Sequence, residues 1–398
     1  MSYITRTKSA APATPGTGKV TQYTDTEGRD HILDATGVDN VLPARQLDNL
    51  VRNSGFWFAQ RQVPGTLTTY SNVSGRSFPA DGWGLTNETA SAQYRRVDTQ
   101  ASYETGMASR FYGEFTKITS AGKLIVTQVI EAADCQRLRG RTVRLTAKMK
   151  QVVGAAPVIR MGLLQLGSSG TVDTIPATFV AVYGGNGVDP TMGSAITRLT
   201  PNAVTGDNCT VNGDGADCTL SSSWQRFSLC FDLPTSYKNL IVAFWSNAQI
   251  AATNGFALGE VQLTDGYELQ DFSALAAAAE LARVQRYYAK TFAIDTAPAA
   301  SVAAGRVSTM LGKAGATALA AIWQWQYPVP MKGTPTVTTY NPGAAGAQGR
   351  QITGTAADLT VTTVSNQSER AVEVTATGAA ASAVGDQAAI HLTADAEM

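Results

Sequence analysis

Pairs of carboxylates are the side chains in this sequence that could support glycan hydrolysis, in which one acts as acid and the other as base or nucleophile. No pair stands out by its spacing in the first third of the chain. Carboxylates in strands and turns are mostly solvated side chains. We therefore predict no catalytic residues and no enzyme activity, although five carboxylates are available for such a role: Asp81, Glu88, Glu104, Glu114 and Glu131.

Histidine chemistry is limited by number and position. His31 and His391 are the two histidines of the chain. A histidine triad or a His/Cys metal site would need opposite ends of the sequence to converge, so we reject both. The run NGDGAD at 212–217 has the oxygen-rich spacing of a calcium loop but lacks the downstream bidentate glutamate. We favour a tight turn there, leave calcium open, and expect no cofactor.

Two further patterns have both a binding and a structural interpretation. IWQWQY places Trp323, Trp325 and Tyr327 on one face of a strand, where they would stack on sugar rings if exposed or fill a core if buried. We favour the core. The run RLRGRTVRLTAKMK could bind an anionic glycan or an acidic neighbour in a virion, but basic residues alternating with apolar ones are typical of a solvated sheet face. Its basic residues are Arg137, Arg139, Arg141, Arg144, Lys148 and Lys150.

Four cysteines are too few for a disulfide framework in 398 residues. Cys209 and Cys218 flank a Gly/Asp-rich loop, and both a short bridge and two thiols remain open for them. Cys135 and Cys230 lie in strand-like surroundings and are interpreted as small core residues.

Composition excludes several classes of protein. The 31 basic and 31 acidic side chains balance, so no global field would hold the chain on nucleic acid or on an anionic membrane. No stretch approaches the ~20 apolar residues of a membrane span, and the N-terminus lacks the apolar core of a secretory signal. We expect synthesis in a bacterial cytoplasm, no nucleic-acid partner and no membrane insertion.

Period-two alternation between about 52 and 266 predicts a sandwich or jelly roll. In GRTVRLTAKMK, apolar residues at 143, 145, 147 and 149 alternate with polar ones, and SSSWQRFSLCFDLP shows the same pattern. These two strands, followed by LIVAFWS and FALGEVQL, resemble carbohydrate-binding-module-like jelly rolls. Phe256, Leu258, Val261 and Leu263 match the motif of the strand that closes such jelly rolls.

The rest of the chain resembles bacteriophage fibre and virion structural proteins. ELARVQRYYAKTF, YPVPMKGTPTVTTYNP and AAIHLTADAEM look like the carboxyl half of such fibres, and PATPGTGKVTQYTDTEGRDHIL looks like a short amino-terminal virion segment. The usual helix motif E-L-x-x-C-Q-R-Y-Y has Val284 here in place of cysteine, which we interpret as a packing change. The resemblance implies a trimer.

One helix interrupts this β-rich pattern. Its apolar stripe consists of Leu275, Leu281, Val284 and Tyr288, which we expect a neighbouring copy to bury in a homotrimer. The alternative is a helix folded against its own jelly roll. A second, shorter helix is expected around Leu47, Leu50 and Val51.

The expected organisation is mostly β: an N-terminal virion-docking arm (1–40), a jelly roll (41–270), a connecting helix (271–292) and a C-terminal β-sandwich (293–398). The function that fits best is a non-enzymatic virion structural protein, a short tail or head fibre or decoration. Its partners would be other virion proteins and host-surface glycan. The alternatives are a polysaccharide depolymerase and a glycan-binding module of a bacterial protein.

Overall fold

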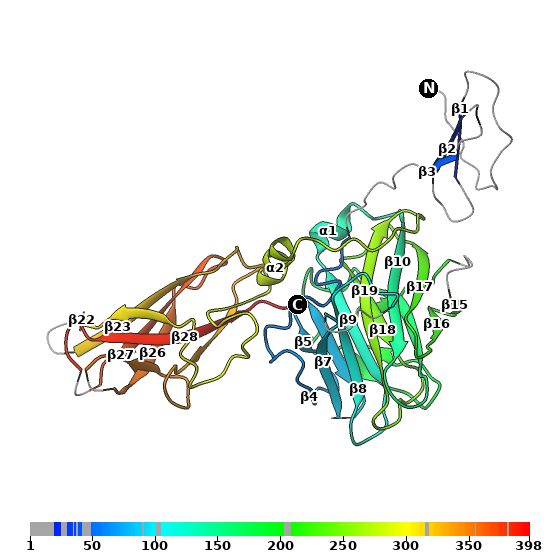
Figure 1. Cartoon of the computed structure of the whole chain (residues 1–398). Coiled ribbons are helices and arrows are strands. Elements are labelled where there is room, and N and C mark those ends of the chain that lie inside the picture. Colours follow the sequence, from blue (N-terminus) through cyan, green and yellow to red (C-terminus); the bar gives the residue numbers. More distant parts are fainter. Residues whose placement is uncertain are drawn as a thin grey trace.

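The computed structural model describes residues 20–24, 30–34, 36, 39–41, 49–89, 91–100, 105–202, 208–314, 318–354, 356–379 and 382–398. The described chain is mostly β, as the alternating sequence predicts, with a jelly-roll unit and a C-terminal unit joined by a helix (Figure 1). Near the N-terminus, three strands form a small antiparallel sheet: β1 (Val20–Thr24), β2 (Asp30–Asp34) and β3 (Asp39–Val41). Most of the expected arm, including the side chain of His31, lies outside the described residues.

The jelly roll consists of two antiparallel sheets that face each other. The six-stranded sheet runs in the order β17 (Gln225–Asp232), β10 (Thr142–Gln151), β19 (Gly255–Asp265), β8 (Phe111–Lys117), β7 (Ala92–Asp98) and β4 (Thr68–Tyr70). The other sheet has β15 (Cys209–Asn212), β16 (Gly215–Thr219), β11 (Val158–Leu166), β18 (Asn239–Trp245), β9 (Leu124–Ile130), β6 (Trp83–Asn87) and β5 (Ser77–Ala80), with β14 (Ile196–Arg198) on β11.

The alternation in β10 and β17 determines which face of the six-stranded sheet is buried. Val143, Leu145 and Met149 point into the core, while Arg144 and Lys148 lie on the outer face. The core therefore forms between the two sheets, and the outer face of the six-stranded sheet is polar. Smaller elements pack against the eight-stranded sheet. The strands β12 (Val180–Val182) and β13 (Thr191–Met192) lie on its outer face, and helix α1 (Ala132–Gln136) contacts β18.

The C-terminal unit is a nine-stranded sheet wrapped around a second core, with β28 at its centre. β28 pairs along its length with four different strands, β20, β21, β24 and β25. The strands are β20 (Tyr288–Lys290), β21 (Val307–Met310), β22 (Gly312–Ala314), β23 (Ala318–Gln326), β24 (Thr336–Tyr340), β25 (Gly349–Gln351), β26 (Asp358–Ser365), β27 (Ala371–Thr377) and β28 (Gln387–Asp395).

The connecting helix α2 (Ala277–Gln285) is shorter than expected, because the chain enters strand β20 directly after it. Tyr288 is therefore a strand residue of the C-terminal sheet. Of the helix expected around Leu47, Leu50 and Val51, Leu47 lies outside the described residues, whereas Leu50 and Val51 are buried and non-helical. Neither described helix has the length and apolar composition needed to cross a bilayer.

A polar junction joins the two units. Arg61 of the jelly roll forms ion pairs with Asp81 (3.4 Å), Asp395 (3.0 Å) and Glu397 (3.5 Å), and its guanidinium lies 3.7 Å from the ring centre of Tyr288. Burial raises the pKa of the Asp81 and Glu397 carboxyls, and Arg61 opposes that shift. The junction is therefore fixed by a buried cluster of charges as well as by packing.

Candidate functional site on the outer face of the six-stranded sheet

Residues 266–276, here called the crossing segment, pass over the outer face of the six-stranded sheet on the way from β19 to α2. Arg144 donates to the carbonyl oxygen of Tyr267 (2.6 Å), and Gln262 donates to that of Asp271 (3.4 Å). The Tyr267 hydroxyl donates to Asp232 (3.2 Å). These bonds hold the segment over the sheet and leave a pocket on each side of it.

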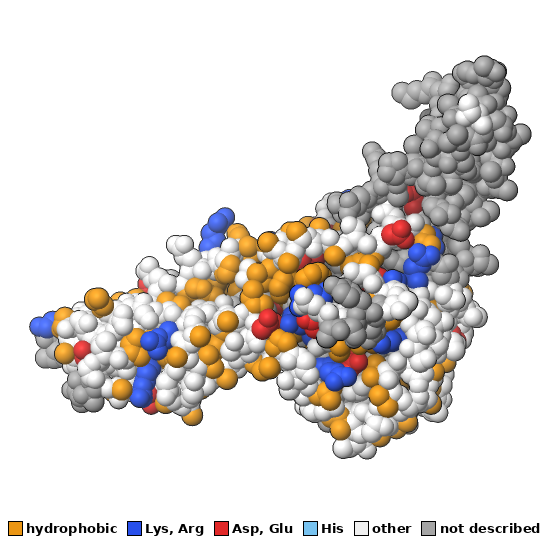
Figure 2. All heavy atoms as spheres, viewed as in Figure 1, with side chains coloured by type: hydrophobic (Ala, Val, Ile, Leu, Met, Phe, Trp, Pro, Cys, Tyr) orange, Lys and Arg blue, Asp and Glu red, His pale blue; other side chains and the backbone are white. Residues whose placement is uncertain are grey.

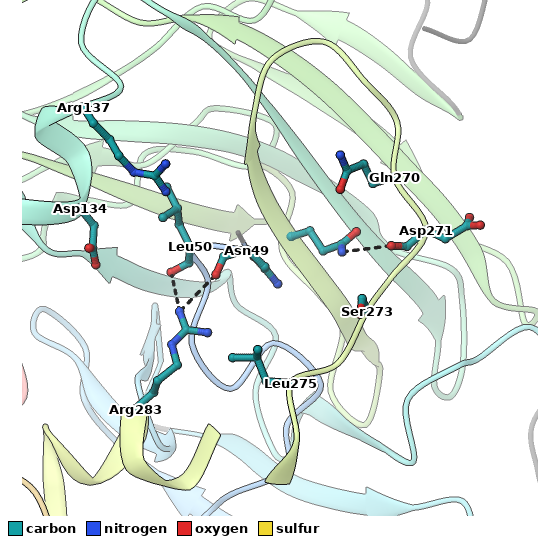
Figure 3. Close-up of a pocket in the computed structure, with 10 residues that line it drawn as sticks. Asn49, Leu50, Asp134, Arg137, Gln270, Asp271, Ser273, Leu275 and Arg283 are labelled. Atoms are coloured by element: carbon teal, nitrogen blue, oxygen red, sulfur yellow. Dashed lines mark hydrogen bonds between the residues drawn. The ribbon is translucent and has the colours of Figure 1, made fainter. Parts of the chain in front are cut away.

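The larger pocket, about 530 Å³, lies between α1, the crossing segment and α2 (Figure 3). The Arg283 guanidinium reaches across from α2 and donates to the carbonyl oxygens of Asn49 (3.2 Å) and Leu50 (3.4 Å). Side chains of both charges surround the space, so it suits a polar ligand with hydroxyl groups. Its other lining residues are Asp134, Arg137, Gln262, Gln270, Asp271, Ser273 and Leu275.

The smaller pocket, about 310 Å³, lies directly on the strands. Lys148 pairs with Glu260 at 2.7 Å, and Arg226 lies 3.9 Å from Asp271 across the pocket. Glu260 also accepts hydrogen bonds from the backbone N–H groups of Ala108 and Ser109, so this carboxylate is held by two donors and one ion pair. The same pocket has an apolar wall at Phe272.

An aromatic and lysine cluster extends this face along β10 and β8. The rings of Tyr112 and Trp224 meet edge to face at 5.0 Å. The Lys150 ammonium lies 5.2 Å from the first ring centre and 5.0 Å from the second. Trp224 is half-buried. Aromatic rings beside hydrogen-bonding side chains are the groups that bind pyranose rings.

Trp323, Trp325 and Tyr327 are not part of any exposed platform. All three are buried in the core of the C-terminal unit, and the rings of Trp325 and Tyr327 meet edge to face at 5.0 Å. The core interpretation of IWQWQY is confirmed, and the glycan platform set against it is wrong.

The carboxylates considered for hydrolysis are separately engaged. Asp81 is held by Gln60 (2.9 Å) and Arg61. Glu114 pairs with Arg95, and Glu131 accepts two bonds from Arg286, at 3.0 and 3.1 Å. Glu88 accepts from the backbone of Lys123 (2.9 Å), whereas Glu104 lies outside the described residues.

The four residues of the predicted apolar stripe were expected to be buried either by a neighbouring copy or by the chain's own jelly roll. Val284 and Tyr288 are 1% and 4% exposed within a single chain, because α2 and β20 pack against the jelly roll. Assigning these two side chains to a neighbouring copy is therefore wrong. Leu275 is 41% exposed and Leu281 is half-buried, and hydrophobic side chains gather on the surface around α2 (Figure 2).

His391 and the NGDGAD run both have structural partners. His391 is fully buried in β28, bonded to Thr291 (2.8 Å) and the Val302 carbonyl (2.9 Å), and burial lowers the pKa of its ring. Residues 212–215 form the turn between β15 and β16, as favoured, and Asp217 pairs with Arg160 at 2.7 Å. Among the described residues, no group of three His, Cys, Asp or Glu side chains is arranged as metal ligands.

The basic run proves to be a mostly paired sheet face. Arg141 pairs with Asp265 (2.8 Å), Arg139 donates to the Tyr237 carbonyl (2.6 Å), and Arg144 donates to the Ser228 hydroxyl (2.6 Å). Arg137 lines the larger pocket, while Lys148 and Lys150 contribute to the smaller pocket and the aromatic cluster.

Sequence reasoning missed Trp224 and the crossing segment. Trp224 stands directly before the alternating residues of β17, where a tryptophan outside the apolar register was the available signal. The crossing segment contains no motif, and its position depends on hydrogen bonds to three strands that are far apart in sequence.

Comparisons with known proteins find similarity only to solved structures, and that similarity is weak. No family model and no curated protein sequence matches the chain. A solved domain of bacteriophage CBA120 tailspike protein 4 is similar at 12% identity with a TM-score of 0.32, over 55% of this chain and 21% of that one. The CBM22-1 xylan-binding domain of Paenibacillus barcinonensis Xyn10C is similar at 10% identity with a TM-score of 0.28, over 57% and 100%.

The tandem CBM22-1-CBM22-2 domain of the same xylanase is similar at 10% identity with a TM-score of 0.29, over 89% of this chain and 91% of that one. The chain spans about a fifth of the tailspike domain that it matches. TM-scores this low do not support an inference about function. The function is therefore argued from the residues of the site.

Proposed function

We propose that the chain is a non-enzymatic virion structural protein of a bacteriophage, a short fibre or decoration that contacts a host-surface glycan through the outer face of the six-stranded sheet. The observation that carries the glycan contact is the combination, on one face, of two polar pockets with the half-buried Trp224 and Lys150. The virion assignment is supported by the resemblance of both ends of the sequence to phage fibre proteins.

Docking through residues 1–40 and assembly as a homotrimer belong to the same proposal. A variant that lacks residues 1–40 should still fold, because the cores of the jelly roll and the C-terminal unit consist of later residues. It should fail to enter virions. Light scattering on the purified full chain should report three copies, and incorporation at the wild-type level by the truncated chain would refute the arm.

Glycan binding is tested by replacing Trp224. The Trp224→Ala protein should lose retention on an array of bacterial surface polysaccharides by at least about fivefold, because one stacked ring contributes ~1 to 3 kcal/mol. Tyr183→Ala is the matched control, since this half-buried aromatic lies outside the outer face of the six-stranded sheet. Equal loss in both variants, or retention by Trp224→Ala, would contradict the site.

The absence of hydrolysis is tested on the same polysaccharides. The proposal is supported by Asp81, Glu88, Glu114 and Glu131, each of which has a hydrogen-bond or ion-pair partner of its own. We expect no reducing ends to be released by the purified chain. Release that survives in Trp224→Ala would instead favour a depolymerase with a site elsewhere.

A further inference from the structure

One pair of cysteines faces each other across the hairpin at the edge of the eight-stranded sheet. β15 and β16 are antiparallel, and their register places Cys209 directly opposite Cys218. The two Sγ atoms lie 3.5 Å apart. Cross-strand neighbours in antiparallel sheets have Cα separations of about 4.5 to 5.5 Å. That range falls within the separation that a disulfide bridges, so the backbone need not move.

The two thiols differ in their access to solvent. Cys218 is fully buried against the jelly-roll core, whereas Cys209 is half-buried at its margin. Burial and the neighbouring Cys209 raise the pKa of the Cys218 thiol well above its usual range. An oxidant arriving from solvent therefore meets Cys209 first.

We propose that Cys209 and Cys218 are a disulfide-forming site that cross-links the β15–β16 hairpin when the protein meets a small-molecule disulfide such as oxidised glutathione. The Cys209 thiolate attacks one sulfur of the oxidant and releases one glutathione thiol. The Cys218 thiolate then attacks the Cys209 sulfur and releases the second. Two electrons and two protons pass from the cysteines to the glutathione, which is reduced.

The remaining cysteines have no such geometry. Cys135 lies in α1 and bonds to backbone groups of Ile130 and Leu240. Cys230 belongs to the other sheet and is opposite Arg144 in the register. Both are 1 to 2% exposed. They are internal controls, because the same oxidant should leave them reduced.

The cross-link would act at an edge of the sheet. Among the strands that the structure describes, β15 is the edge strand and pairs with β16 alone, so its ladder is supported from one side. Edge strands open more easily than central ones, and they offer unpaired backbone groups to other chains. A bridge between Cys209 and Cys218 holds that edge closed. This proposal does not depend on glycan binding.

The test is oxidation of the purified full chain with oxidised glutathione, followed by unfolding, alkylation and tryptic mass spectrometry. No lysine or arginine separates Cys209 from Cys218, so one peptide carries both. That peptide should be lighter by two hydrogens and carry no alkyl group, while the Cys135 and Cys230 peptides become alkylated. Amide hydrogen exchange across 209–219 should slow at least threefold on oxidation.

Two matched variants decide the outcome. Cys230→Ser should behave as the wild type, whereas Cys209→Ser should leave Cys218 fully alkylated after the same treatment. Full alkylation of both cysteines in the wild type, or a stable glutathione adduct on Cys209, would overturn the proposed site. Unchanged exchange in a bridged protein would overturn its role in holding the edge.

Discussion

Arg61 forms buried ion pairs at the junction between the jelly roll and the C-terminal unit. Arg61 is 16% exposed and faces two carboxylates, Asp81 and Glu397, that are 1% and 3% exposed. Buried charges are tolerated only when they are paired, because the interior solvates them poorly. The Arg61 guanidinium is therefore a principal polar contact between the jelly roll and the C-terminal unit, beside the Arg286–Glu131 pair and the packing around it.

Replacing Arg61 with Met tests this dependence. The substitution leaves the two buried carboxylates without their cation, and breaking a buried pair in this way costs about 3 to 5 kcal/mol. Chemical denaturation should report that loss at pH 7. Arg226→Met is the control, because Arg226 is 39% exposed and lies 3.9 Å from an exposed Asp271, where surface pairs contribute ~0 to 1 kcal/mol. Equal losses in the two variants would contradict the buried cluster.

Glu131 gives the junction a dependence on pH. Burial acts to raise the pKa of this carboxyl, but hydrogen bonds from Arg286 and Tyr287 outweigh burial and hold the pKa below its usual value near 4.5. A carboxyl with a lowered folded-state pKa binds fewer protons when folded, so its stabilisation is present above pH ~4.5 and is lost as the pH falls through the folded pKa.

The prediction is that wild-type stability falls more steeply than that of Glu131→Gln as the pH is lowered from 5 to 3. Asp81 and Glu397 act in the opposite sense, because a raised folded pKa stabilises the folded state at low pH. Comparing the two proteins removes that shared contribution. Parallel pH curves of unfolding free energy would contradict the role of Glu131.

At the scale of elements, α2 is a connector fitted to its own chain. Glu280, 2% exposed, accepts from the backbone N–H of Asn53, and Arg283 donates to the carbonyls of Asn49 and Leu50. Val284 packs underneath and is 1% exposed. The helix therefore closes the jelly roll whether or not copies of the chain assemble.

Val284→Asp should destabilise the isolated chain by several kcal/mol, because it buries an unpaired carboxylate. Leu275→Asp, at a position 41% exposed, should change the melting temperature by less than a few degrees. Scanning calorimetry on monomer and oligomer fractions measures the effect of each substitution on thermal stability. If Leu275→Asp lowers only the mass seen by light scattering, the exposed end of the crossing segment, directly before α2, contacts a neighbouring copy.

The elements were predictable to the extent that their residues alternate. Val143, Leu145 and Met149 in β10 identify a strand and its buried face, and Trp323 and Trp325 do so in β23. The end of α2 was not predictable, because Tyr287 and Tyr288 fit a helical stripe equally well. Tyr287 lies in the turn after α2, and pairing of β20 with β28, about a hundred residues later, makes Tyr288 a strand residue. The pockets under the crossing segment also arise from distant contacts and leave no local pattern.

At the scale of the whole molecule, the residues after β28 return to the jelly roll. The Ala396 N–H donates to the Tyr287 carbonyl (2.8 Å), and the Gly82 N–H donates to Glu397 (3.0 Å). Met398 packs against apolar residues of the eight-stranded sheet. The C-terminal unit therefore contacts the jelly roll through both its first and its last strand (Figure 1).

Removing residues 396–398 should loosen this junction while both cores stay intact. We expect calorimetry to resolve two transitions where the full chain gives one, and small-angle scattering to report a larger radius of gyration. The substitution Thr338→Ala, in the middle of β24, serves as a control in the same unit. A single unchanged transition in the shortened chain would show that the helix side alone holds the units together.

The ion pair between Arg61 and Asp395 joins residues 334 positions apart. During synthesis, Arg61 and Asp81 emerge early, and at ~5 to 20 residues per second the carboxylates that complete their cluster follow tens of seconds later. Until then the surface that will receive them remains open to water. Docking of the two units is therefore a late event in the life of each chain, and a nascent jelly roll must stay soluble with that surface uncovered.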